Sequence, residues 1–303
     1  MKKFLLHLLA FALLIVGIDQ IGGRVLLKLY SSAKKDYPAK FLHVAHEGTE
    51  DVIIYGSSRA FRHYDPAVIQ EESGLTAFNA GNQGNGVVFA YGLYQVSRAH
   101  HVPKVAIIDI YYEYDLMPTH ANTRFIDLLK PFYGESSDLQ GYFRRIDPWT
   151  PLTMQSMLYR TNSQLFTILK SQRGDNNLPN GFEPLPIPPQ AIDENLTVPH
   201  LDFTTDSSKI HVMEDMIELM KNDGVQVILS FAPVWHNLEY FPFRDSIASI
   251  AHRHQVEFWD FSTNEGLSAK DFHDLGHLNS EGANRFSHFV GQRLKNKLSC
   301  SPL

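Results

Sequence analysis

The sequence predicts an α/β fold in which a doubly wound parallel sheet is covered by helices on both faces. Short apolar runs rich in β-branched residues alternate along the chain with segments whose apolar residues recur at helical spacing. The alternation begins near residue 51, stops at about 113 and resumes at about 208. Since such alternation is typical of parallel sheets, we expect one domain over 51–303 with a large insertion at about 113–208.

The composition excludes several classes of protein. Apolar residues make up 44% of the 303 residues and charged residues 20%, which are ordinary values for a globular chain. Lysine and arginine number 27 against 33 acidic residues, so no basic surface for nucleic acid is expected. With Cys300 as the only cysteine, neither an intramolecular disulfide nor a cysteine zinc site can form. Fifteen histidines include no helical HExxH pattern, and we expect neither a metal nor another cofactor.

The N-terminal segment 1–30 is interpreted as an uncleaved signal anchor that forms a transmembrane helix. Lys2 and Lys3 precede fifteen residues, 4–18, that carry no formal charge. A full span needs roughly 20 residues, which the apolar stretch 21–30 helps to supply. No small-x-small cleavage site follows, so cleavage is the alternative interpretation, and a buried amphipathic helix is another.

The two lysines before the apolar run favour a cytoplasmic location for the N-terminus. The domain would then be extracytoplasmic, meaning periplasmic or on the cell surface if the source is bacterial. The polar and mixed segment 31–50 is expected to be a linker.

Five strands and five helices are expected in the body of the chain. The strands are expected near 51–56, 75–78, 104–112, 225–231 and 256–261. The helices are expected at 65–73, 87–100, 210–224, 243–254 and from Ser280 onward. Asp65 and Ser280 are suitable N-caps, and Gly224 is a suitable helix stop. A five-stranded sheet of this kind is flavodoxin-like.

The insertion differs in character from the rest of the chain. It includes a proline-rich stretch at 176–189, and helices are expected around 123–129 and 156–169. Because it leaves the sheet at the carboxyl end of a strand, we expect it to shape a substrate pocket.

Two short motifs at strand ends carry the expected chemistry. Gly56-Ser57-Ser58 follows a buried strand, where a tight turn would expose a serine at a helix N-terminus that favours negative charge. Asp274 and His277 stand just before the last helix, and an aspartate at this spacing orients an imidazole if the loop turns. A serine hydroxyl needs such a base to become a nucleophile. The alternative for His277 is an ordinary capping or surface histidine.

These motifs, in this order, resemble the SGNH (GDSL-like) hydrolase superfamily over about 51–112 and 210–298. The first block, Gly-Asp-Ser, matches 56–58, with Ser57 where aspartate usually stands; the second, Asn-x-x-x-x-Gly, matches 79–84; the last, Asp-x-x-His, matches 274–277. The resemblance implies Ser58 as nucleophile, with Ser58 and Gly84 as amide donors of the oxyanion hole. It further implies that Asp274 orients His277.

The third block departs from the superfamily pattern. Gly-x-Asn-Asp is expected after the middle strand, but residues 109–113 read Asp-Ile-Tyr-Tyr-Glu, so the asparagine that donates to the oxyanion has no clear equivalent. Possible substitutes are the phenols of Tyr111 and Tyr112 and the amides of Asn82 and Asn85. Arg59 and Trp235 are further candidates for substrate contact.

The membrane segment and the variant blocks are similar to those of the membrane-anchored DltD, AlgX and AlgJ-like branch. This implies a serine acyl esterase or O-acyltransferase that acts on an acylated carbohydrate or cell-envelope polymer outside the cytoplasm. The alternative is a catalytically inactive member of the same fold that binds glycans or assists envelope assembly. The membrane and the polymer are the expected partners, and the sequence does not predict an oligomeric state.

Overall fold

The computed structural model describes residues 1–118, 126–193, 204–235, 242–263 and 266–300. Its centre is a sheet of five parallel strands in the order β2-β1-β3-β4-β5, which is the flavodoxin-like order. The strands are β1 (Val52–Gly56), β2 (Ala77–Asn79), β3 (Val105–Asp109), β4 (Gln226–Phe231) and β5 (Glu257–Asp260). The predicted fold class is therefore confirmed.

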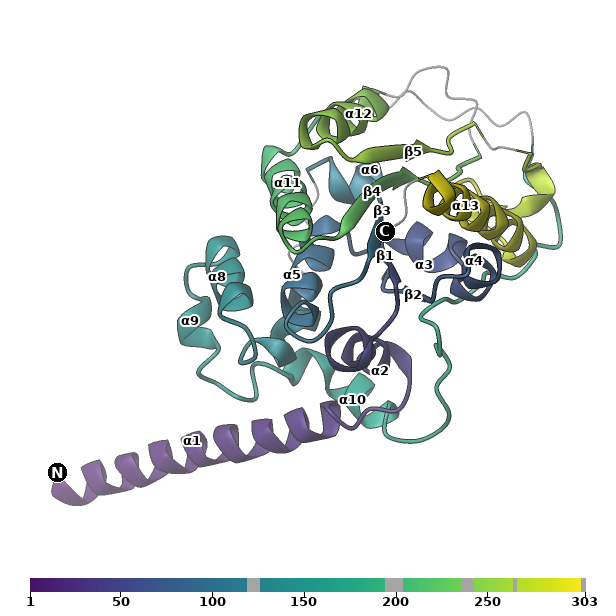
Figure 1. Ribbon diagram of the computed structural model, residues 1–303. Helices are drawn as coiled ribbons and strands as arrows, with labels where there is room; N and C mark the ends of the chain where they lie inside the picture. Colours follow the sequence, from purple (N-terminus) through teal and green to yellow (C-terminus); the bar gives the residue numbers. More distant parts are fainter. Residues whose placement is uncertain (119–125, 194–203, 236–241, 264–265, 301–303) are drawn as a thin grey trace.

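Helices cover both faces of the sheet (Figure 1). Because side chains alternate along a strand, Ile53 and Tyr55 of β1 enter one hydrophobic core, whereas Val52 and Ile54 enter the other. The first core is closed by α5 (Val87–Ser97), α11 (Ser207–Asn222) and α12 (Pro242–His254). The second is closed by α4 (Pro66–Ser73) and α13 (Ser280–Cys300).

The ends of α4 follow the local signals in the sequence. The Asp65 carboxylate accepts a hydrogen bond from the backbone N–H of Ala67 at 2.9 Å, and Pro66 occupies the first helical position. The helix ends at Gly74, whose φ of 77° is readily adopted by glycine. The remaining elements around the carboxyl edge are the short helix α3 (Ser58–His63) and an antiparallel hairpin of β6 (Phe272–Asp274) and β7 (His277–Leu278).

The segment expected to be a linker is part of the folded domain. It contains α2 (Asp36–Leu42) and a π-helical turn, η1 (His43–Glu47). Phe41, Val44 and Ala45 are buried in the first core, which explains why this polar-looking segment folds. The linker prediction for 31–50 is thus wrong, because a few apolar residues spaced among the polar ones suffice to anchor the segment.

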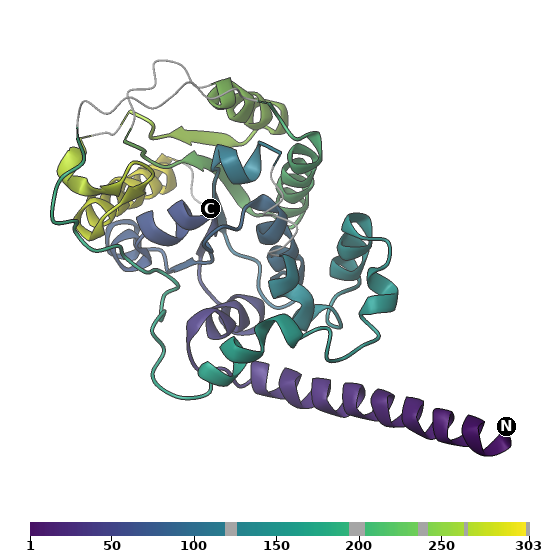
Figure 2. The same ribbon diagram turned by 180° about the vertical axis from the view of Figure 1, so that it is seen from behind.

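Helix α1 (Lys2–Tyr30) is long and apolar enough to cross a membrane by length and composition. Its residues from Phe4 to Val16 are exposed on every side, which contradicts the alternative of a buried amphipathic helix. The helix extends away from the domain in both overall views (Figures 1 and 2). It has the properties expected of a membrane anchor or a signal sequence.

The insertion is mostly helical and lies near α1 and α5. Its described elements are α6 (Tyr112–Asp115), η2 (Ile126–Phe132), α8 (Ser137–Ile146), α9 (Thr150–Thr153), η3 (Asn162–Gln164) and α10 (Leu165–Lys170). Helix α8 packs on α5, and α10 packs on α1 and α2, so these helices lie away from Ser58. The expected helix at 123–129 lies partly outside the described residues, and the one at 156–169 is confined to η3 and α10.

The proline-rich stretch returns along the edge of the sheet. The carbonyl of Asn180 accepts the N–H of Asn79 at 3.0 Å, and the carbonyl of Leu185 accepts the N–H of Ser280 at 2.8 Å. Farther along, the carbonyl of Pro186 lies 2.8 Å from Nδ1 of His273 on the hairpin. This stretch therefore brings the insertion close to the hairpin, although the helices of the insertion lie elsewhere.

Candidate active site

Ser58 stands at the start of α3, directly after the buried strand β1. Between them Gly56 adopts a φ of +143°, and a Cβ there would lie 2.7 Å from the carbonyl oxygen of Asp109 and 2.9 Å from Cβ of Ala60. Only glycine fits this turn, which sends the chain from the strand into the helix. The turn places Ser58 at the first helical position, where the backbone N–H groups have no partner within the helix.

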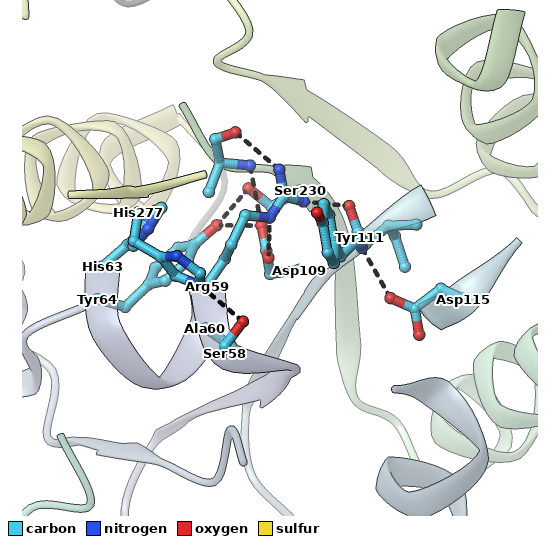
Figure 3. A network of polar contacts seen from close by, with 12 residues as sticks. Ser58, Arg59, Ala60, His63, Tyr64, Asp109, Tyr111, Asp115, Ser230 and His277 are labelled. Carbon is cyan, nitrogen blue, oxygen red and sulfur yellow. Dashed lines mark hydrogen bonds and ion pairs between the residues drawn. The ribbon is translucent and has the colours of Figure 1, made fainter. Parts of the chain in front are cut away.

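A continuous chain of hydrogen bonds joins Ser58, His277 and Asp274. The hydroxyl oxygen of Ser58 lies 2.8 Å from Nε2 of His277 (Figure 3). On the other side of the ring, Nδ1 of His277 lies 2.9 Å and 3.1 Å from the two carboxylate oxygens of Asp274. When the imidazole is neutral with its proton on Nδ1, Asp274 accepts that proton's hydrogen bond and Nε2 is free to accept from the serine hydroxyl.

The hairpin keeps Asp274 ionised. Partial burial raises the pKa of this carboxyl, but the hydrogen bonds from His277 and from the N–H of Gly276 outweigh it, so the pKa is lowered below its usual value. Ser58 is 8% exposed, whereas the side chains of His277 and Asp274 are 27% and 53% exposed. The serine lies at the bottom of the site and the other two residues form part of its open rim.

His63 joins α3 to the hairpin, a role that the sequence did not reveal. Its Nε2 accepts the backbone N–H of Leu278 at 3.1 Å, and its ring lies edge-on to His277 with the centroids 6.1 Å apart. Burial lowers the pKa of His63 well below its usual value, and the nearby charges of His277 and Arg59 lower it further. His63 is therefore neutral near pH 7, and it fixes the position of β7, on which His277 stands.

The loop after β2 is tied to α3 through Asn79. The side-chain oxygen of Asn79 accepts the N–H of Gly81 at 3.0 Å, and its amide donates to the carbonyls of Ala60 and Tyr64 at 2.6 Å and 2.8 Å. This explains why an asparagine begins the second block: it fastens the loop beside the helix that carries the serine. Gly84, farther along the loop, adopts a φ of +74° and is half-buried.

Asn82 and Asn85 are both buried, but they differ in their contacts. The backbone N–H of Asn82 donates to the carbonyl of Gly56 at 3.0 Å, which closes the loop against the end of β1. Asn85 is fully buried, and neither its side-chain oxygen nor its nitrogen has a hydrogen-bond partner among the described residues. A buried amide without partners is uncommon in folded proteins, which makes Asn85 the most conspicuous polar group of this loop.

The third block supports the fold through a buried ion pair. Nε of Arg59 lies 3.4 Å from Oδ2 of Asp109, and both side chains are buried. Oδ1 of Asp109 accepts hydrogen bonds from Tyr64 at 3.0 Å and from the N–H of Ala232 at 2.8 Å (Figure 3). The guanidinium also donates to the carbonyls of Ala232 and Ile110. The expectation that Arg59 contacts substrate is thus wrong, because its side chain is fully buried and its guanidinium is paired with Asp109 and with main-chain carbonyls in the core.

Tyr111 and Tyr112 follow β3 at the place of the missing asparagine. The Tyr111 ring is half-buried and lies over the guanidinium of Arg59, 4.7 Å from ring centroid to Cζ. The Tyr112 ring is 9% exposed and stacks on Phe243 with centroids 4.6 Å apart. This packing contradicts the expected role of Tyr112 in substrate contact and leaves Tyr111 as the more accessible phenol.

Asp115 and Trp235 lie at the two flanks of this region. The carboxylate of Asp115 accepts the N–H groups of Tyr111 and Val87, so it links the turn after β3 to the start of α5. Burial raises the pKa of Asp115 to about 7. Trp235 is half-buried, packs against Phe272 of the hairpin with ring centroids 5.4 Å apart, and remains a prediction as a substrate contact.

Lys40, on α2, supports the loop that follows β2. Its ammonium is buried, donates to the carbonyls of Gly81 and Gly181, and lies 4.1 Å from the centroid of the Phe61 ring. Burial lowers the pKa of Lys40 well below its usual value, and the charge of Arg62 lowers it further. No sequence signal marked this lysine, because its segment was interpreted as a linker. Helix α2 therefore contributes to the support of the site.

Within the described part of the chain, no group of three or more histidine, cysteine, aspartate or glutamate side chains is arranged to hold a metal ion. Nε2 of His277 lies within hydrogen-bond distance of the Ser58 hydroxyl and Asp274 bonds the opposite side of the same ring, an arrangement suited to proton transfer.

Comparison with known proteins finds likeness only among solved structures. No family model matches the sequence, and no curated protein matches it. One similar structure is a candidate acylhydrolase from Bacteroides fragilis NCTC 9343, 12% identical, with a TM-score of 0.42 over 88% of this chain and 100% of that one. Another is a candidate lipolytic protein of the G-D-S-L family from Desulfitobacterium hafniense DCB-2, 11% identical, with a TM-score of 0.39 over 80% and 99% of the two chains. Likeness at this level supports no inference about activity, which must come from the site itself.

Proposed function

We propose that this protein is a serine acyl hydrolase of the SGNH type, in which Ser58, His277 and Asp274 form the catalytic triad. The observation that carries the proposal is the hydrogen-bond chain from Asp274 through His277 to Ser58, built from residues on two distant segments. A serine at a helix start, an imidazole within hydrogen-bond distance of its hydroxyl and a carboxylate bonded to the other ring nitrogen are the groups that acyl transfer requires.

The proposed reaction has two halves. The hydroxyl oxygen of Ser58 attacks the carbonyl carbon of an ester while Nε2 of His277 takes its proton, which gives a tetrahedral intermediate. The intermediate collapses as His277 returns the proton to the departing alkoxide, leaving an acyl-serine and a free alcohol. Water then repeats the sequence, deprotonated by His277, and releases the acid and Ser58. If an acceptor hydroxyl replaces water, the same steps transfer the acyl group instead.

The negative charge of the intermediate needs hydrogen-bond donors. The N–H of Ser58 lies at the start of α3, and that of Gly84 belongs to the loop fastened by Asn79. We assign the third donor to the side-chain amide of Asn85, in place of the asparagine absent from the third block. Its support is that this amide is buried and without a partner among the described residues, so its N–H groups remain available to an oxyanion.

The proposed substrate is an acylated carbohydrate or cell-envelope polymer outside the cytoplasm. Two features support this class. Helix α1 has the length and hydropathy of a membrane anchor, and Lys2 and Lys3 at its start favour a cytoplasmic N-terminus. The side chains of His277 and Asp274 are 27% and 53% exposed, so solvent and a large substrate can reach these groups.

The direct test uses the full chain and its Ser58→Ala variant. The wild type should hydrolyse p-nitrophenyl acetate and become labelled at Ser58 by a fluorophosphonate, whereas the variant should do neither while keeping the wild-type circular dichroism spectrum. Equal hydrolysis rates for the two proteins would refute the proposal.

A second candidate function is a catalytically inactive glycan-binding or envelope-assembly protein. The observation in its favour is the third block, where Asp109 and Arg59 neutralise each other in the core and no asparagine stands. Absence of fluorophosphonate labelling together with retained binding to acylated glycans would favour this candidate over the enzyme.

A further inference from the structure

Helix α1 is joined firmly to the domain in its second half. The carboxylate of Asp19 accepts hydrogen bonds from the hydroxyl of Ser156 and from the N–H groups of Met157 and Leu158, the latter two at 3.0 Å and 3.3 Å. At Gly23 a Cβ would lie 2.2 Å from the carbonyl carbon of Met157, so helix and loop touch backbone to backbone. Helix α1 therefore cannot swing relative to the domain without breaking these contacts.

The length of a membrane span places this junction at the membrane surface. A hydrocarbon core of about 30 Å takes about 20 helical residues at 1.5 Å each. Counted from Phe4, just after the charged Lys2 and Lys3, such a span ends near Gly23. The loop 156–158, which contacts α1 between Asp19 and Gly23, thus lies at the level where the bilayer ends.

The part of the domain that lies just on the membrane side of this level is apolar. Helix α9 stands immediately before the loop; Trp149, its N-cap residue, is 70% exposed, and Leu152 within it is 67% exposed. Figures 1 and 2 show α9 beside the middle of α1, nearer the free end of α1 than its junction with the domain and on the side away from α3 and α13, so α9 lies on the membrane side of the level where the span ends. An exposed tryptophan beside a leucine is unfavourable in water but is typical of the membrane interface.

Basic side chains lie near this region, together with the exposed carboxylate of Asp147, which accepts the N–H of Trp149. Arg144, at the end of α8, is exposed, as are Arg24 and Lys28 on α1 just beyond the end of the span. Their positions match the headgroup layer, where arginine and lysine pair with lipid phosphates while their aliphatic stems lie on apolar surface. The exposed basic residues and the exposed Trp149 and Leu152 therefore indicate the same location for the bilayer surface.

We propose that α9, through Trp149 and Leu152, inserts into the interface of the leaflet that faces the domain. This inference rests on the proposed anchoring of α1. The protein then contacts the bilayer at two places, the span and α9, and the domain has one orientation on the membrane. In that orientation α3, which carries Ser58, lies on the side of the domain away from the free end of α1, so the site reaches substrate from the solvent side (Figures 1 and 2).

The test uses the full chain reconstituted into vesicles of equal parts phosphatidylcholine and phosphatidylglycerol, with bromine at carbons 6 and 7 of the acyl chains. Bromine quenches tryptophan fluorescence at short range. The wild type should show a quenched component that Trp149→Phe removes and Trp235→Phe keeps, while Trp259, buried in the second core, stays unquenched. Quenching that is unchanged in Trp149→Phe would overturn the proposal.

A second measurement is independent of tryptophan. In a Cys300→Ser background, a spin label at Leu152→Cys should be more accessible to oxygen, which concentrates in lipid, than to a polar nickel complex. A label at Asn284→Cys, exposed on α13, should show the reverse preference. Equal preferences at the two positions would also overturn the proposal.

Flotation separates failure of the anchor from failure of the α9 contact. A chain that does not float with the vesicles contradicts the membrane anchor and, with it, this inference. A chain that floats while Trp149 stays unquenched contradicts the α9 contact alone.

Discussion

Nε2 of His277 lies 2.8 Å from the hydroxyl oxygen of Ser58, although 219 positions separate the two residues in the chain. The contact forms because β1 ends at a glycine turn that presents Ser58, while the hairpin before α13 carries His277. His63, between them, ties the two segments together through its bond to Leu278.

Replacement of Asp274 by asparagine should lower kcat on the order of 10²- to 10⁴-fold, because the amide no longer holds His277 in the tautomer that accepts from Ser58. The measurement is the hydrolysis rate of p-nitrophenyl acetate. Asp271, whose buried carboxylate pairs with Arg285, offers a control: Asp271→Asn should affect stability more than kcat. A wild-type kcat in Asp274→Asn would contradict the proposed role.

The lowered pKa of Asp274 also makes the stability of the protein depend on pH. The stability that the ionised Asp274 carboxylate contributes is present above the pKa of this group in the unfolded chain, and it is lost as pH falls through the pKa in the folded protein.

Replacement of Asn85 by alanine should lower kcat by about 10²- to 10³-fold with little change in thermal stability. The reason is that the Asn85 amide has no partner to lose among the described residues, so its removal leaves no new unsatisfied group. Asn82→Ala is the matched control on the same loop. If Asn82→Ala loses the activity and Asn85→Ala keeps it, the assignment of the third oxyanion donor to Asn85 is wrong.

Replacement of Lys40 by methionine should destabilise the protein, because the carbonyls of Gly81 and Gly181 lose their buried donor. Each unsatisfied carbonyl costs about 1–3 kcal/mol. Urea denaturation in a non-ionic detergent measures the loss, with the exposed Lys34→Met as the control. Equal unfolding midpoints for the two variants would show that Lys40 does not support the loop.

Replacement of His63 by glutamine should reduce the acid sensitivity of the fold. The pKa of His63 is lowered in the folded state, so the unfolded chain binds a proton below its pKa of about 6.5 that the folded chain does not. Stability therefore falls as pH drops below about 6.5, by up to about 1.4 kcal/mol per pH unit from this one group. Glutamine keeps an acceptor for the N–H of Leu278 but cannot titrate. Urea midpoints between pH 5 and 7.5 should decline less steeply in the variant, and identical slopes would contradict the prediction.

Much of the fold could be predicted from periodicity and end signals. The five strands, the main helices after residue 51, the cap at Asp65 and the apolar helix α1 all follow from local sequence. The prediction failed for 31–50, because this segment is held in place by the packing of Phe41, Val44 and Ala45 in the first core. That packing involves residues distant in the chain, so the local sequence does not indicate it. Helix α8 was not predicted, although local signals for it are present: Leu139, Tyr142, Phe143 and Ile146 recur at helical spacing, and the hydroxyl of Ser136 caps the first turn.

By itself, the sequence determined the fold class and the long apolar N-terminal helix, because both depend on local patterns of apolar residues. Its short motifs, through their resemblance to a known family, made Ser58, Asp274 and His277 candidates for one site. Tertiary structure alone decided that Arg59 is a core residue paired with Asp109, that Lys40 and His63 support the site, and that α1 is fastened to the domain at Asp19. The physical reason is that burial and long-range hydrogen bonds change what a charged side chain does, and neither can be read from its neighbours in the chain.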